Sequence, residues 1–339
     1  MLIWDGIDPV ELTGFVRAGL ADRPQNQFEL ERWLPNEPVV DLEYRFSAGG
    51  QGLLDAATFR SFDAEAPIGS RPSTVRKSGE LPPISRKIRL GEYDRLRVRN
   101  ANDEIRNCVF NDAARMMSQI RARLELARGE ALHSGQVVLN ENGVIATISF
   151  GRSGSHSVTA GTPWSTVATA TPLTNELAWI DTYVTTNGVR PGVAVTSSTV
   201  MSYLMQNAEY RALVGRNGFV PSRVSQTDVN DIRNDFGLPP LFVYDAQVRV
   251  AGAATRVIPV DKFLYLPAAG SAEGAELGAT LYGVTAEALE LDGLAGSDEA
   301  GITAVAMKSF DPVSIWTKAA AIALPVVANP DLTFVADVA

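Results

Sequence analysis

The sequence is poor in the residues that build covalent and metal-bound frameworks. Its 339 residues include one cysteine, Cys108, and two histidines, His133 and His156. A single cysteine excludes an intramolecular disulfide, and these three residues together cannot assemble the usual zinc sites. Cys108 lies within a strongly helical pattern, where we expect it to be a small core residue.

Motifs of enzymes, membrane proteins and exported proteins are also missing. The chain has no P-loop, no dinucleotide-binding glycine motif and no nucleophile elbow. The acidic run 290–300 lacks the ligand spacing of an EF-hand and is predicted to be a solvated loop. No apolar run approaches the roughly 18 residues of a membrane helix. The N-terminus lacks the basic region of a signal peptide, so we expect synthesis in a cytoplasm. Because the motifs above are missing, we expect no catalytic, cofactor-binding or metal-binding residues.

An excess of positive charge is absent too. Lys and Arg number 30 against 39 Asp and Glu, which gives a net charge of −9. This balance argues against a dedicated nucleic-acid binder. Hydrophobic residues make up 45% and charged residues 20%, which is typical of a globular protein with room for about two domains.

A long proline-rich, basic stretch interrupts the first third of the chain. Residues 61–90 contain too few large apolar side chains to fold on themselves, and compact domains rarely contain such a long connection without structure of its own. Alternating residues at 42–46 before it, and Leu96 and Val98 after it, predict two flanking strands. The stretch is therefore predicted to be the tip of a long hairpin-like projection.

An arm and a long helix are predicted on either side of this projection. In residues 1–45, Asp8 and Pro9 begin a short helix that gives way to extended chain. From Asn102 a helix of about 30 residues, roughly 45 Å long, ends near Gly135. Its apolar residues recur every three or four positions on one narrow face, at Ile105, Val109, Ala113, Met116, Ile120, Leu124, Ala127 and Ala131. We interpret this helix as a spine for another element, in preference to a coiled-coil strand, because the pattern spans only about four heptads.

The remainder predicts a hairpin, an α/β unit and a returning C-terminus. The hairpin turns at Asn142 and Gly143, and the helices then alternate with strands. The predicted hairpin strands are 137–139 and 144–150, the helices are 174–187, 198–214 and 226–236, and the strands of the α/β unit are 193–196 and 241–244. The apolar segments 322–327 and 332–338 are predicted strands that pair with an earlier element.

Charge is distributed unevenly along the chain. Between Arg71 and Arg99 nine basic residues stand against three acidic ones, a balance of +6, whereas between Asp261 and Asp311 the balance of two against nine is −7. Either both segments are solvated surfaces, or the basic one docks on an acidic surface, most simply that of a second copy. The candidate inter-subunit contact residues are Arg71, Arg76, Lys77, Arg86, Lys87 and Arg89.

The order of these parts resembles the major capsid proteins of tailed phages with the Hong Kong 97-type fold, and more closely the lambda-like major capsid protein E family. Four stretches carry the resemblance. They are FGRSGSHSVTAGTPWS at 150–165, VDKFLYLPA at 260–268, LYGVTAEALEL at 281–291 and KSFDPVSIWTKAAAIALPVVANPDLTFVADV at 308–338. The last is the most specific, and the resemblance covers essentially the whole chain.

The resemblance implies an α+β capsid fold with four parts. These are an N-arm at 1–45, an extended E-loop hairpin at 46–99, a peripheral domain at 100–174 and 301–339 with a spine helix at 102–133, and an α/β axial domain at 175–300. The E-loop would reach over an adjacent subunit. Some relatives cross-link an E-loop lysine to a neighbour's asparagine, and Lys77 or Lys87 and Asn329 could take these roles. The lambda-like branch lacks that bond, so we expect a non-covalent shell.

The implied function is structural, without enzymatic activity. Copies would self-assemble as hexamers and pentamers into the icosahedral head shell around the double-stranded DNA of a tailed bacteriophage, without sequence-specific DNA binding and without a membrane. A scaffolding protein, a portal and a decoration protein are the expected partners, and the scaffold would be separate because the chain starts almost directly in the N-arm. We expect the protein in the virion capsid, assembled in the host bacterial cytoplasm. An encapsulin-like nanocompartment shell is the alternative, and an unrelated hydrolase or binding module would require an accidental match.

Overall fold

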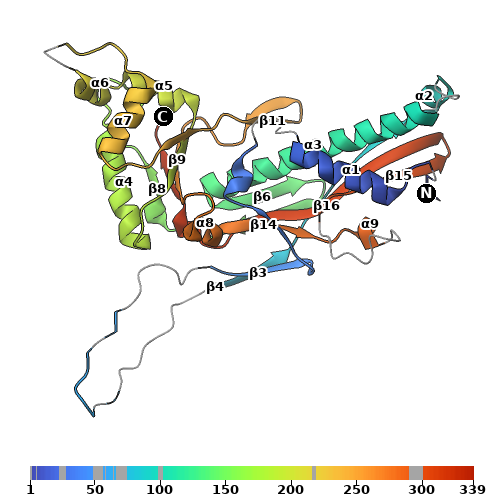
Figure 1. Cartoon of the computed structure of the whole chain (residues 1–339), viewed down its shortest axis with the longest axis horizontal. Helices are drawn as coiled ribbons and strands as arrows, with labels where there is room; N and C mark the ends of the chain where they lie inside the picture. Colours follow the sequence, from blue (N-terminus) through green and yellow to red (C-terminus); the bar gives the residue numbers. More distant parts are fainter. Residues whose placement is uncertain are drawn as a thin grey trace.

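The computed structural model describes residues 2–4, 6–22, 28–48, 56–57, 59–63, 65, 75–97, 102–215, 219–289 and 301–339. The molecule is elongated (Figure 1). A long helix and a sheet extend along one half, and helices packed on a second sheet form the opposite end. A two-stranded ribbon leaves the body between them. The separate helical and sheet regions confirm the predicted α+β class.

Strand β16 (Val313–Val327) is the centre of a six-stranded sheet. One of its edges pairs antiparallel with β15 (Thr303–Phe310) and then with β14 (Gly278–Gly283), and the other edge pairs with β5 (Pro83–Leu90). The short strands β1 (Leu2–Ile3) and β2 (Asn36–Pro38) pair with β15 and β14. The prediction that the C-terminal segment returns to pair with earlier elements is confirmed.

Helix α3 (Asn102–Ser134) lies along β16 and confirms the predicted spine helix (Figure 1). All eight residues of the predicted stripe are buried. Opposite the stripe, β16 contributes Ala319, Ala321 and Ala323 to the same hydrophobic cluster. Because alanine side chains are small, the helix can approach the sheet closely along its length.

The predicted arm packs on its own chain over the residues that the structure describes. Asp8 begins α1 (Pro9–Asp22) as predicted, and its Oδ1 accepts a hydrogen bond of 2.9 Å from the amide of Val10. Leu12 and Val16 of α1 are buried in the cluster formed by α3 and the six-stranded sheet. Further on, the 3₁₀ helix η1 (Leu30–Arg32) begins a segment that enters the central core.

A mixed five-stranded sheet supports the α/β region. Its strand order is β10–β9–β13–β17–β8, in which β10 is parallel to β9 and β8 is parallel to β17. The strands are β8 (Ser157–Thr159), β9 (Val193–Thr196), β10 (Leu241–Val243), β13 (Lys262–Leu266) and β17 (Phe334–Asp337). The helices are α4 (Pro172–Asn187), α5 (Ser198–Gln206), α6 (Ala208–Val214) and α7 (Gln226–Asp235). Gly188 ends α4 in the left-handed region, as its predicted capping role requires.

The predicted helix 198–214 is wrong as a single element, because the chain breaks at Asn207. The side chain of Asn207 caps α6 by accepting from the amide of Glu209, and it donates to the carbonyl oxygens of Val167 and Ala170. The Asn207 side chain is fully buried, and these hydrogen bonds satisfy both its oxygen and its nitrogen. The break therefore has a tertiary cause that helical periodicity does not carry.

Small hairpins and short elements complete the fold. Strands β6 (Gln136–Glu141) and β7 (Val144–Ser149) turn at Asn142 and Gly143, both with positive φ, which confirms the predicted turn. A second hairpin joins β11 (Gln247–Val250) to β12 (Ala253–Arg256), and the projecting ribbon joins β3 (Glu43–Ala48) to β4 (Val75–Glu80). The other short elements are η2 (Gly154–His156), α8 (Ala272–Leu277), α9 (Ala286–Leu289) and η3 (Pro330–Leu332).

The strand predicted from Leu96 and Val98 is wrong, because residues 92–97 form helix α2 (Glu92–Arg97). Pairing of β5 with β16 ends at Leu90, and α2 begins two residues later, at Glu92. Acidic residues occupy the first turn of α2 and basic residues the last, an order that favours a helix through its dipole. The alternation of apolar and charged residues was compatible with both conformations.

The core prediction for Cys108 is also wrong, since its side chain is exposed. Val109, the next residue, belongs to the buried stripe of α3. The adjacent position is turned by about 100° around the helix and therefore faces away from the sheet.

Sheet membership crosses the predicted domain boundaries. β14 falls in the predicted axial domain but pairs with β16, and β17 falls in the predicted peripheral domain but pairs with β13. Each of the two sheets therefore contains strands from both predicted domains. The division at residues 174 and 300 stays a prediction.

Candidate inter-subunit surface

The predicted basic projection divides into two structures. β3 and β4 form the ribbon that leaves the body, whereas β5 belongs to the central sheet (Figure 1). Ile84, Ile88 and Leu90 alternate along β5 and pack against the cluster beneath α3. The expectation that residues 61–90 do not pack on their own core is therefore wrong for β5, because its few apolar residues all fall on one face.

The three basic residues of β5 point to different sides of the sheet. Arg86 shares the face of Ile84 and Ile88, while Lys87 and Arg89 project from the opposite face. There the Lys87 ammonium lies 4.7 Å, and the Arg89 guanidinium 5.9 Å, from the centre of the Trp316 ring. Within the part of the chain that the structure describes, these three cations form no ion pair. They are available to a partner, although not on one common surface.

The remaining predicted contact residues lie on or beyond the ribbon. Lys77 is in β4, and its Nζ donates a hydrogen bond of 2.7 Å to the carbonyl oxygen of Ser149 in β7. This bond ties the base of the ribbon to the body of its own subunit. Arg71 and the side chain of Arg76 lie outside the described residues. Of the four predicted contact residues whose side chains the structure describes, only Lys87 and Arg89 lie together, at Trp316.

Part of the acidic segment already has partners within the chain. Lys318 forms an ion pair with Glu287, and Lys262 forms ion pairs with Asp261 and Asp337. Burial acts to raise the pKa of Glu287, but the hydrogen bond and charge of Lys318 hold that pKa below its usual value. Glu290 and the acidic residues from 292 to 299 lie outside the described residues.

A buried anchor holds the chain between the arm and the ribbon. Leu30, Trp33 and Leu34 are buried in the central cluster, and the indole nitrogen of Trp33 donates to the carbonyl oxygen of Pro267 at 3.0 Å. Three large apolar residues in a five-residue segment give it far more burial than the extended chain around it. The segment positions both the arm before it and the ribbon after it.

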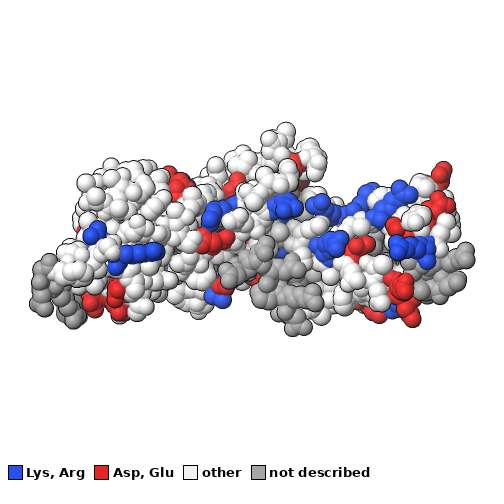
Figure 2. Space-filling view, turned by 90° about the horizontal axis from the view of Figure 1, so that it is seen from above, with Lys and Arg blue, Asp and Glu red and all other residues white. Residues whose placement is uncertain are grey.

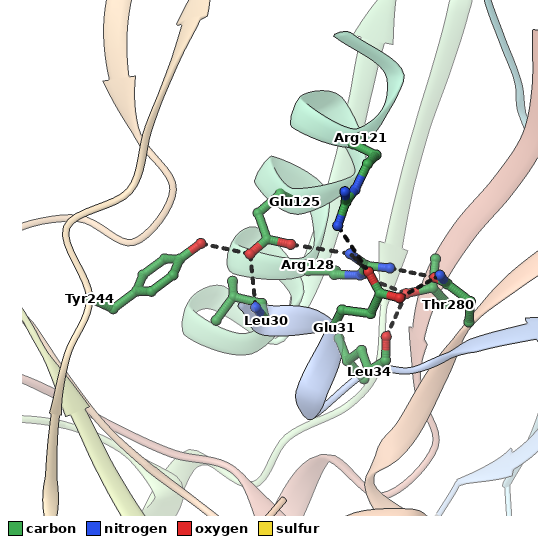
Figure 3. Close-up of polar contacts among 9 residues, drawn as sticks. Leu30, Glu31, Leu34, Arg121, Glu125, Arg128, Tyr244 and Thr280 are labelled. Atoms are coloured by element: carbon green, nitrogen blue, oxygen red, sulfur yellow. Dashed lines mark hydrogen bonds and ion pairs between the residues drawn. The ribbon is translucent and has the colours of Figure 1, made fainter. Parts of the chain in front are cut away.

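Glu125 and Arg128 of α3 bind this anchor through polar contacts (Figure 3). Glu125 Oε1 accepts hydrogen bonds from the amide of Leu30 at 2.8 Å and from the hydroxyl of Tyr244 at 2.7 Å. Its other oxygen pairs with Arg128 Nη1 at 3.1 Å. Arg128 then donates to Thr280 Oγ1 at 2.8 Å and to Asn36 Oδ1 at 2.6 Å. One buried ion pair thus joins the anchor, α3, β14 and the end of β10.

The electrostatics of this network follow from its burial. Burial, with the nearby Glu125 carboxylate, raises the pKa of Tyr244 far above its usual value. The tyrosine is therefore a neutral donor at any physiological pH. A comparable cluster lies in the α/β region, where Glu176 pairs with Arg233 and accepts hydrogen bonds from the hydroxyls of Tyr210 and Tyr265.

The titratable residues that the structure describes do not gather into a metal-binding cluster. The His, Cys, Asp and Glu residues that the structure describes form no group able to hold a metal ion. His156 is buried, with its Nδ1 3.3 Å from the carbonyl oxygen of Thr333. No helix within the described ranges is long and apolar enough to cross a membrane.

Comparison with known protein families gives a match that covers almost the whole chain. The sequence model of the phage major capsid protein E family matches residues 24–338. The chain belongs to this family. The resemblance inferred from the sequence is thereby confirmed, and the capsid interpretation is stronger than the encapsulin-like alternative. A search of curated proteins gave no match.

Solved structures share the capsid fold at low sequence identity. A protein described as a prophage capsid protein of Escherichia coli CFT073 is 14% identical, with a TM-score of 0.63, over 96% of this chain and 99% of its own. A phage-related protein from Bordetella bronchiseptica RB50 is 10% identical, with a TM-score of 0.60, over 99% and 98% of the two chains. The capsid protein of a native GTA particle is 9% identical, with a TM-score of 0.50, over 93% and 91%.

Sequence reasoning missed the residues that organise this capsid subunit internally. Glu125 and Arg128 adjoin Leu124 and Ala127 of the stripe, so a charged i, i+3 pair at the border of an apolar face was the available signal. Tyr244 and Thr280 carried no signal, because only the tertiary fold brings them to α3. Trp316 lies before the predicted strand 322–327 and was noted only as part of the stretch 308–338 that carried the family resemblance.

Proposed function

We propose that copies of this chain assemble into the icosahedral head shell enclosing the double-stranded DNA genome of a tailed bacteriophage. The observation that carries the proposal is the family match over residues 24–338. The net charge of −9 supports it, because a strongly basic lining would immobilise the genome during packaging. The role is structural, and the protein is not an enzyme.

The proposed partners follow from this role. Copies form hexamers and pentamers, and a scaffolding protein, a portal and a decoration protein complete the head. DNA is enclosed without sequence-specific contacts. Assembly takes place in the cytoplasm of the host bacterium, and the product is the virion capsid.

We place the first contacts between neighbouring subunits on the ribbon and on β5. The ribbon is proposed to reach over an adjacent copy, with Arg71, Arg76, Lys77, Arg86, Lys87 and Arg89 as contact residues. The exposed, unpaired cations of β5 support this assignment, because an acidic patch on a neighbour would steer and orient its approach.

Electron microscopy of the purified protein, with and without the scaffolding protein, tests the proposal. Closed shells are expected, and a discrete monomer or dimer under all conditions would contradict it. Particles isolated from the host during phage growth should contain nuclease-protected double-stranded DNA. Particles filled with a cargo protein and free of DNA would favour the encapsulin-like alternative.

A further inference from the structure

A surface groove runs between helices α1 and α3, which lie side by side near the N-terminus (Figure 1). Glu11 and Phe15 of α1 line it on one side, and Asn107, Phe110 and Asn111 of α3 line it on the other. The rings of Phe15 and Phe110 meet edge to face on its floor, with their centroids 4.8 Å apart and an angle of 77° between their planes. Phe15 is 46% exposed, so the groove presents aromatic surface to solvent.

The shape of the groove suits a third helix. Ala18 follows Phe15 by about one turn of α1, and Ala114 follows Phe110 by about one turn of α3. Both alanines are exposed, and their small side chains leave the groove open. Side chains of a third helix can therefore enter between α1 and α3, in the way that helices pack in globular proteins. Because recognition of this kind places apolar residues spaced by three or four on an apolar floor, the groove favours an amphipathic helix.

The end of the groove at the N-termini of both helices is acidic. Glu11 Oε1 lies 3.0 Å from Arg106 Nη2, and this ion pair brings the first turns of α1 and α3 together. The carboxylates of Asp8, Glu11, Asp103 and Glu104 lie in these turns or directly before them. Within the described part of the chain, Asp103 and Glu104 form no ion pair. Basic side chains at one end of a docked helix would be attracted to this charge, and acidic ones would be repelled.

The described helices of this chain offer no basic face that a second copy could insert. Helices α4, α5, α8 and α9 contain no Lys or Arg, and α2 has as many acidic as basic residues. Arg211 of α6 donates to the carbonyl oxygen of Pro221, and Arg233 of α7 is buried. Four of the five arginines of α3 already pair with glutamates, and Arg17 of α1 donates to the carbonyl oxygen of Ile302. A basic helix that matches the groove therefore comes from another protein.

We propose that the α1–α3 groove is a docking site for a basic amphipathic helix of another protein. The apolar face of that helix packs on Phe15 and Phe110, and its lysines or arginines meet the carboxylates at the acidic end. So short a groove buries little area, and the contact is therefore weak, reversible and further weakened by salt. This surface is separate from the ribbon and from the Lys87–Arg89 face, and docking here goes beyond the proposed shell function.

A synthetic peptide tests the chemistry of the groove. The probe is a fluorescent helical peptide of about 14 residues, or four turns, with leucine on one face and lysine on the other. Fluorescence anisotropy with the unassembled protein should show binding at micromolar concentrations that weakens as salt is added. The same peptide with glutamate in place of lysine should not bind. Absence of binding by the lysine peptide, or equal binding of the two peptides, would overturn the proposal.

Variants locate the peptide on the protein. Phe15→Ser removes half of the aromatic floor, and Asp103→Asn with Glu104→Gln removes charge without changing the size of the side chains. Each should weaken binding about tenfold, and the charge variant keeps the test valid if Phe15→Ser unfolds. Phe219→Ser is the matched control, because Phe219 is 72% exposed beside Asp228 in another groove that combines apolar and acidic residues. Loss of binding in Phe219→Ser, or wild-type binding in both α1–α3 variants, would contradict the assignment.

Occupation of the groove by a second copy is a distinguishable outcome. Analytical ultracentrifugation of the unassembled wild-type protein should show a monomer, with the same sedimentation for Phe15→Ser. A wild-type dimer that Phe15→Ser abolishes would overturn docking of another protein. None of these measurements uses assembled shells, so failure of the proposed function would appear separately, in electron microscopy.

Discussion

Glu125 illustrates how single buried residues join distant parts of this subunit. Its carboxylate is 1% exposed and accepts hydrogen bonds from the Leu30 amide of the anchor and from the Tyr244 hydroxyl of the α/β region. In Tyr244→Phe the carboxylate loses one of these donors. We expect the unfolding free energy to fall by about 1–3 kcal/mol and the Leu30 amide to exchange hydrogen faster, although Tyr244 reaches that amide only through Glu125.

A matched control separates this coupling from a general loss of stability. Tyr265→Phe removes the same hydroxyl from the comparable Glu176 cluster and should cost a similar free energy. Because the Tyr265 hydroxyl donates to Glu176 and not to Glu125, exchange at Leu30 should follow only the global change in stability. Equal exchange at Leu30 in both variants would show that Glu125 does not link the two regions.

His133 should make the stability of the protomer depend on pH. Burial, with the charges of Lys262 and Arg152, lowers the pKa of His133 to about 4. The pKa in the unfolded chain is about 6.5, so the unfolded state binds the proton first as the pH falls. Stability is therefore complete above about pH 6.5 and is lost between pH 6.5 and 4. Between pH 7 and 4.5, urea unfolding should show a loss larger by about 2 kcal/mol in the wild-type protein than in His133→Gln. An identical loss in both proteins would exclude this role.

At the scale of elements, the position of β5 changes what proteolysis should reveal. The sequence alone predicts early tryptic cuts across the whole basic segment. Arg86 and Lys87, however, lie in a strand that is paired with β16 along its full length. In the unassembled protomer we expect cuts after Arg76 and Lys77 of the ribbon before any cut in β5. Mass spectrometry of the first fragments measures this order, and early cleavage after Arg86 would contradict the placement of β5.

Sequence reasoning recovered the elements whose pattern is set by residues close together in the chain. The stripe of α3, the Asn142–Gly143 turn and the Gly188 cap were all predicted, because each reflects a local periodicity or a positive φ. The break at Asn207 and the pairing of β5 were not, since both depend on partners far away in the chain. The candidate contact residues were recognised by charge, but their division between two faces required the register of β5 with β16.

At the scale of the whole molecule, the two faces of β5 can be compared in assembly. Lys87→Glu with Arg89→Glu reverses the face that carries Trp316, while Arg86→Glu reverses the face of α3. If a neighbour's acidic surface docks on the Trp316 side, the double variant should assemble about tenfold more slowly, and moderate salt should slow the wild-type protein in the same direction. Arg86→Glu should have the smaller effect. Circular dichroism must show both variants folded, and wild-type rates for both would mean that the charges are ordinary solvated surface.

We also predict a shell without covalent links between subunits. Asn329, the residue at which a lysine cross-link would form, is 8% exposed, and its backbone N–H donates to the carbonyl oxygen of Leu277. Lys87 lies over Trp316 and Lys77 donates to Ser149, so each ammonium group already has a contact within its own chain. A lysine that reached Asn329 would meet a largely buried residue. A reaction between lysine and asparagine also requires both groups to be held in contact. Mature shells boiled in detergent should therefore run as single chains of 36.4 kDa. A ladder of multimers that survives boiling would contradict this, and mapping the linked peptides would identify the residues involved.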